Sequence, residues 1–117
     1  MNEYLLLFRN AAAPDGYTTT SADRANDMPL WQAWIGKIAM QGALVSTAPI
    51  QFQASLVSAT SVTHTPYRNQ DDVIVSGFLI CRAPDAATVE EWSKDCPILR
   101  YPHSTVEIRP IIPFPTS

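Results

Sequence analysis

Charged residues are scarce in this sequence, at 16% of 117 residues, and its eight lysines and arginines are scattered. A nucleic-acid backbone is bound by a basic stripe or patch, so this composition argues against nucleic acid as a partner. Glycine is rare as well, at four residues, and none of them belongs to a glycine-rich loop that could hold phosphate groups. A nucleotide cofactor held in that way is therefore not expected.

Cysteine and histidine are limited to two residues each. The two histidines are far apart, as are Cys81 and Cys96, so the short ligand pairs of zinc sites are missing and we expect no metal and no cofactor. No Ser-His-Asp elbow motif occurs. Because Cys81 falls in a predicted strand and Cys96 in a predicted helix, we expect two reduced thiols that pack as small apolar groups.

Long apolar runs are absent too. No stretch approaches the ~20 apolar residues of a membrane span. The opening MNEYLLLFRN has only a short apolar run with an acid before it, unlike the basic start of a signal peptide. We expect a cytoplasmic protein that does not bind membranes.

The sequence does contain enough apolar residues, 46%, for a folded core. At this length, division into two domains would leave each half with too little core, so residues 1–117 are predicted to form one domain.

Two segments read as buried central strands, Glu3–Arg9 and Val73–Arg82, because both are apolar on two faces. In the second, strict alternation puts one set of side chains on one face (Val73, Val75, Leu79, Cys81) and another set on the opposite face (Ile74, Phe78, Ile80).

The remaining elements follow from periodicity and from capping and turn residues. A helix is predicted up to Gln41, capped by Ser21 or Asp27, with Pro29 tolerated if it lies in the first turn after Asp27. Its apolar stripe would comprise Leu30, Trp31, Trp34, Ile35 and Ile38. A second helix begins at Asp85 and ends at Pro97, with Trp92 on its inner stripe. Further strands are predicted at Leu44–Ile50, Ser55–Thr63 and Ser104–Ile111, and loops at Asn10–Thr20 and Tyr67–Asp72.

Leu44–Ile50 and Ser55–Thr63 are predicted as the two halves of one long hairpin at a sheet edge, where Pro49 does least harm. With this hairpin counted once, the elements run in order strand, helix, two strands, helix, strand. This is the α+β, ferredoxin-like βαββαβ arrangement, in which two helices cover one face of an antiparallel four-stranded sheet. The other face would remain apolar, at Phe78 for example. We therefore expect a homodimer that covers this face by pairing two sheets.

Several segments resemble the YCII-related family in its DGPF-domain branch: EYLLLFR, WQAWIGKIAMQG with ALVSTAPI, VIVSGFLICRAPD, DCPIL and TVEIRPI. The resemblance implies a dimeric α/β barrel. The family's Asp-Gly-Pro-Phe motif is degenerate here, as His64-Thr65-Pro66-Tyr67, and the predicted first helix has no histidine. The His and Asp pair of better-known members therefore cannot be carried over.

Four residues are candidates for a ligand site. His64 and Tyr67 flank Pro66 and would present an imidazole and a phenol at a pocket mouth, suited to acid or base chemistry. Arg9 and Arg109 each end a strand and could hold a carboxylate or phosphate. The alternatives are an exposed turn for the first pair and ordinary ion pairs for the arginines.

The leading hypothesis is a small-molecule-binding dimer with its pocket between the sheet and its partner, either a weak enzyme or a binder of a small organic anion. A ligand-sensing or regulatory accessory module and a purely structural dimer are the alternatives. A ligand retained near His64, Tyr67 or Arg109 would favour the small-molecule-binding protein or the ligand-sensing module, and an occluded apolar pocket would favour the purely structural dimer.

Overall fold

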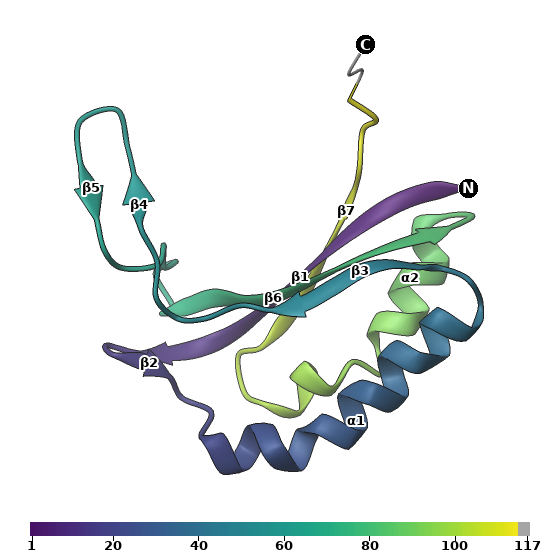
Figure 1. Ribbon diagram of the computed structural model, residues 1–117, viewed down its shortest axis with the longest axis horizontal. Helices are drawn as coiled ribbons and strands as arrows, with labels where there is room; N and C mark the ends of the chain where they lie inside the picture. The colour runs from purple at the N-terminus through teal and green to yellow at the C-terminus, as the bar shows by residue number, and fades with distance from the viewer. Residues whose placement is uncertain (115–117) are drawn as a thin grey trace.

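An antiparallel sheet with two helices on one side forms the body of the protein (Figure 1). The computed structural model describes residues 1–114. β1 (Asn2–Ala13) pairs with β6 (Val73–Ala83) at the centre; β7 (Thr105–Pro110) borders β1, and β3 (Leu44–Pro49) borders β6. The order β3-β6-β1-β7 is that of a ferredoxin-like fold, so the predicted α+β class and the two predicted central strands are confirmed.

The core lies between the sheet and the helices α1 (Ser21–Met40) and α2 (Ala86–Ser93). Phe8 on β1 contacts the rings of Trp31 and Trp34, with centroids 5.2 and 5.9 Å away. The Trp34 indole Nε1 donates a hydrogen bond of 2.8 Å to the Trp92 carbonyl, which links the two helices. The expectation that the three tryptophans line the inner sides of the helices is confirmed, whereas Leu30 is exposed.

β1 is longer than predicted and its two faces differ in burial. The expected loop at Asn10–Thr20 instead continues the strand to Ala13 and returns through the two-residue β2 (Gly16–Tyr17), because Pro14 and Asp15 make a tight turn. Burial alternates along β1, with Tyr4, Leu6 and Phe8 buried toward the helices and the residues between them half-buried.

α1 is capped by Thr20, one residue before the first of the two predicted caps, Ser21. The hydroxyl of Thr20 accepts from the backbone N–H of Asp23, whose carboxylate accepts from the N–H of Thr20. This reciprocal capping box fixes the helix start at Ser21 and leaves Pro29 in the helix interior. Asp27, the other predicted cap, is instead buried inside the helix span.

The second helix also ends earlier than predicted, at Ser93. Asp85 caps its start as expected. Pro97 does not end this helix, because it begins a separate 3₁₀ helix, η1 (Pro97–Arg100).

A bulge at Ser76 in β6 changes which side chains share a face. Phe8 pairs with Gly77 and Arg9 with Val75, so Ser76 has no partner in β1. The extra residue reverses the alternation before it. The predicted faces are therefore wrong for three residues: Ile74 lies on the helix side, and Val73 and Val75 lie on the helix-free side.

The helix-free face carries a strip of apolar side chains at its centre, here called the apolar strip (Leu5, Leu7, Phe78, Ile80). All four are half-buried in the single chain. Less apolar surface is therefore exposed here than a flat, bare sheet would offer.

The predicted strand Ser55–Thr63 is a separate hairpin. β4 (Leu56–Val57) and β5 (Val62–Thr63) pair only with each other, because Ser58 and Ser61 close a turn between them. With its flanks this hairpin forms a projection, here called the arm (residues 54–66). In Figure 1 the arm and the C-terminal segment rise on the side of the sheet opposite the helices.

Candidate functional site

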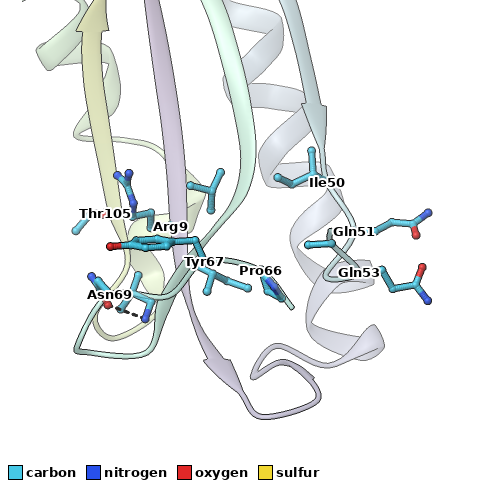
Figure 2. A pocket seen from close by; sticks show the side chains of 12 residues that line it. Arg9, Ile50, Gln51, Gln53, Pro66, Tyr67, Asn69 and Thr105 are labelled. Carbon is cyan, nitrogen blue, oxygen red and sulfur yellow. Dashed lines mark hydrogen bonds between the residues drawn. The ribbon is translucent and has the colours of Figure 1, made fainter. Parts of the chain in front are cut away.

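A hollow of about 700 Å³ opens on the helix-free face where the arm joins the sheet (Figure 2). This volume lies within the range of small-molecule sites. Its lining comes from four places: the strands β1, β6 and β7, the segment after β3, the base of the arm, and the segment after the arm. The lining residues are Arg9, Ile50, Gln51, Gln53, Ala54, Pro66, Tyr67, Asn69, Val73, Ile74, Val75 and Thr105.

Arg9 provides the positive charge of this hollow. In the sheet register it lies between Val75 on β6 and Thr105 on β7, so its side chain stands on the helix-free face. Its Nη1 donates to the Oε1 of Glu107 at 2.5 Å, and only 28% of the side chain is exposed. The guanidinium is thus held in place by one acid.

Glu107 connects two arginines. Its second oxygen, Oε2, accepts from Nη1 of Arg109 at 3.4 Å. The hydrogen bond from Arg9 and the two positive charges lower the pKa of the Glu107 carboxyl. The three side chains therefore carry a net charge of +1 beside the hollow.

Tyr67 is positioned by its neighbours in sequence. Arg68 donates to the backbone carbonyls of Ala13 (2.8 Å) and Pro14 (3.1 Å), and the Asn69 side-chain oxygen accepts from the N–H of Val73 at 3.0 Å. These bonds tie the segment to the end of β1 and to the start of β6. The Tyr67 ring itself is exposed at the mouth of the hollow.

The structure brings together two of the four predicted site residues. Arg9 and Tyr67 line the same hollow, and Figure 2 shows them on the same side of it as Asn69 and Thr105. Arg109 does not line it but reaches its edge through Glu107. His64 lies on the arm, is exposed, and lines neither this hollow nor a smaller one of about 510 Å³ beside Arg68.

Sequence reasoning missed the neutral polar groups of the site. Thr105 could have been found from strand register, because it lies opposite Arg9 in an antiparallel pair. Asn69 gave no signal, because it lies in a polar turn far from Arg9 in sequence. In Figure 2 the amide ends of Gln51 and Gln53 point away from Arg9, so these two contribute their stems to the wall.

The lining restricts the chemistry of the hollow. It contains one cation, a phenol, amide and hydroxyl groups and apolar side chains, and it contains no carboxylate, imidazole or thiol. Such a set can bind and orient an anionic ligand, whereas a general base would have to come from outside the lining.

Other centres are not found in the part of the chain that the structure describes. Within residues 1–114 no three His, Cys, Asp or Glu side chains are grouped so as to hold a metal ion. No helix in this part is long and apolar enough to cross a membrane.

The comparison with solved structures finds a similarity in fold. No protein-family model and no curated protein matches the chain. A solved structure of 5-chloro-2-hydroxyhydroquinone dehydrochlorinase from Burkholderia phenoliruptrix, in complex with 2,5-dihydroxybenzoquinone, is similar over 88% of this chain and 90% of its own, with 14% identity and a TM-score of 0.47. A similarity at this level does not extend that enzyme's activity to this chain, and the predicted family stays a prediction.

Proposed function

We propose that the protein binds a small organic anion, such as a carboxylate, in the hollow at Arg9, and that it does so as a homodimer. The observation that supports this most is the lining: one arginine stands over an apolar floor with neutral hydrogen-bonding groups around it and no carboxylate. An arginine suits this role because its planar group can hold a carboxylate through two parallel hydrogen bonds.

The charges around the hollow favour binding of an anion with modest affinity. Glu107 already pairs with Arg9, so an incoming carboxylate must compete with it. Arg109 offsets this competition, because it donates to the other carboxylate oxygen of Glu107. Tyr67 at the mouth would contact the rest of the ligand through its ring and hydroxyl group.

Binding rather than catalysis is the function that this lining supports. No group in the hollow combines with a second one in the way a nucleophile and its base do. A ligand-sensing role and a weak enzyme would share the same binding step, so the anion site is the property to test first.

The site is tested by titrating ¹⁵N-labelled protein with a panel of small aliphatic and aromatic carboxylates and following amide shifts. Shifts should centre on Arg9, Asn69 and Thr105. Arg9→Gln should weaken binding at least tenfold. The matched control is Arg82→Gln, which removes an arginine that pairs with Glu3 at the other end of the sheet, and it should bind as the wild type does. If no carboxylate shifts these amides, or if both variants lose binding equally, the proposed site is wrong.

The dimer is tested by sedimentation at micromolar concentration, which should give twice the chain mass of 12.9 kDa. Phe78→Asp puts a charge on the apolar strip and should give a monomer or insoluble protein. Met40→Asp, at an exposed position on α1, is the control and should remain dimeric. If the protein is a dimer but binds no anion, the hypothesis of a purely structural dimer is the one that remains.

A further inference from the structure

The arm is an exposed element without visible support in a single chain. Residues 55–65 are all exposed, and β4 and β5 pair only with each other. Two-stranded hairpins of this kind are marginally stable in water unless something packs on them. The chain is also less compact than is usual: its radius of gyration is 15.4 Å, against about 13 Å for a compact domain of this length.

The arm has an apolar face. Val57 and Val62 are direct cross-strand partners, so their side chains lie on the same face of the hairpin. They are 70% and 57% exposed, respectively. The hydrogen bond from the Ser58 N–H to the Ser61 carbonyl closes the tip but leaves this pair uncovered.

The arm also lacks the charges that keep an exposed hairpin in solution. No Asp, Glu, Lys or Arg occurs between Lys37 and Arg68. Natural proteins protect exposed strand edges with charged side chains, lysine above all, because unpaired edges otherwise associate. An uncharged hairpin with a valine pair on one face is typical of a segment that is covered in the working protein.

The apolar strip alone is too small to hold the proposed dimer. Its four half-buried side chains offer about 50 Å² each, or about 200 Å² per chain, where a standard interface buries ~800 Å² per partner. The C-terminal segment, which rises on the same side of the sheet as the arm (Figure 1), carries two more exposed apolar residues, Ile112 and Phe114. With Val57 and Val62 they add about 500 Å², which brings the total close to the standard size.

We propose that the arm of each chain packs against the helix-free side of a second copy of the same chain, with its Val57–Val62 pair covered by that copy. This inference rests on the homodimer of the proposed function. One two-fold axis would cover the strip, the arm and the C-terminal segment of both chains at once, because all three lie on one side of each chain.

The length of the arm agrees with this placement. Sheets that pack face to face lie ~10 Å apart, and a strand of five residues spans about 16 Å. An arm that rises from the sheet therefore extends beyond the surface of a facing sheet and lies along the partner. Because the base of the arm lines the hollow through Ala54 and Pro66, the same contact would hold one wall of the site in place.

The placement is tested with a spin label at the tip of the arm, through Ala59→Cys. Ala59 is exposed and lies in the turn, and the native Cys81 and Cys96 are buried, so the label should attach at this position alone. Chains at natural isotope abundance that carry the nitroxide are mixed with ¹⁵N-labelled chains that carry no nitroxide. Broadening of the ¹⁵N amide signals then reports only contacts between chains.

We expect broadening in the ¹⁵N chains at residues of the helix-free side, such as Leu5, Ile80 and Ile112. The same label at Met40→Cys, on the other side of the sheet, should not broaden them. Broadening that appears only when label and ¹⁵N are on one chain would mean that the arm folds over its own sheet, and would overturn the inference. Broadening confined to α1 and α2 would overturn it as well.

A charged variant gives a second, independent readout. Val57→Lys with Val62→Lys should shift the sedimenting species toward the monomer, while Met28→Lys with Met40→Lys, at exposed positions on α1, should not. A variant dimer as tight as the wild type would overturn the role of the arm and leave the dimer and the anion site standing. A wild-type monomer would overturn the arm placement and the dimer together, and the carboxylate titration would still decide the anion site.

Discussion

The Tyr101 hydroxyl donates a hydrogen bond to Oδ2 of Asp27, a carboxylate buried in the middle of α1. Arg100 donates to the other oxygen, Oδ1, at 2.6 Å. The two bonds attach η1 and the residue after it to the helix. This cluster stabilises the fold on the side opposite the hollow, because it satisfies both oxygens of a buried acid.

Removal of the acid should therefore be costly. We expect Asp27→Ala to lower the free energy of unfolding by about 2–3 kcal/mol, since Tyr101 and Arg100 lose a charged acceptor. Tyr101→Phe should cost about 1–2 kcal/mol, because Arg100 still pairs with the acid. Urea denaturation followed by far-UV circular dichroism measures both. Equal and small effects would show that the cluster does not stabilise the fold.

The same cluster predicts a pH dependence at the alkaline end. The hydrogen bond to Asp27, burial and the negative charge of this acid raise the pKa of Tyr101 to about 12. A raised pKa in the folded state favours the protonated phenol, so this contribution is complete below pH ~10 and is lost as the pH rises toward 12. Between these values the wild type should lose stability faster than Tyr101→Phe. Parallel curves for the two proteins would contradict the assignment.

Glu107 competes with the proposed ligand for Arg9, which leads to a gain-of-binding variant. Glu107→Gln removes the competing charge and leaves a side chain of the same size, so carboxylate affinity should rise several-fold at low salt and the difference should shrink at high salt. The pKa of Glu107 is lowered by Arg9, so its carboxyl stays charged to lower pH than an ordinary glutamate and the difference should persist at pH 5. Weaker binding in this variant would show that Glu107 positions Arg9 rather than competing for it.

The variant His64→Ala distinguishes a role of this histidine in ligand binding from a structural role in the arm. Because His64 is exposed and makes no contact with the hollow of its own chain, His64→Ala should leave the melting temperature unchanged. If the histidine serves the site, it does so through the arm of the second copy, and the variant should lose carboxylate binding while it remains a dimer. Binding as in the wild type would remove His64 from the site, and a fall of several degrees would make it structural.

Both thiols should be inert in the native protein. Burial raises the pKa of Cys81 to about 11 and that of Cys96 to about 12. At pH 8 about one in a thousand Cys81 groups would then be a thiolate, the reactive form. A chromogenic disulfide reagent should label neither residue until denaturant is added. Rapid labelling of Cys96 in the native state would reopen the question of a nucleophile.

The sequence alone predicted the sheet order well. The two longest apolar segments had to be the central strands, and each of the other capped or periodic segments could be only one helix or strand of a βαββαβ chain. It failed where a single residue changes the geometry. The bulge at Ser76 reversed the faces of Val73–Val75, and periodicity cannot detect an unpaired residue. Gly77 marks this place in retrospect, since a Cβ there would lie 3.1 Å from the Ala48 carbonyl oxygen.

The candidate site was predictable in its charges and not in its shape. Arg9 is a polar residue at the end of an apolar segment, which is a signal that sequence reasoning can use. Asn69 and Gln53 reach the hollow through turns whose paths depend on the arm, and no local pattern specifies where a projecting hairpin returns to the sheet. The arm itself was misread as one strand, because its turn contains serine, alanine and threonine rather than glycine or asparagine.

The position of the three tryptophans has an optical consequence. Trp31, Trp34 and Trp92 all lie on the helical side, with Trp34 buried among aromatic rings and hydrogen-bonded to the backbone of α2. Their ultraviolet fluorescence would therefore follow loosening of the helices and remain silent when two chains separate or a ligand enters. A dye or a new tryptophan placed on the arm would be needed to see those events by emission.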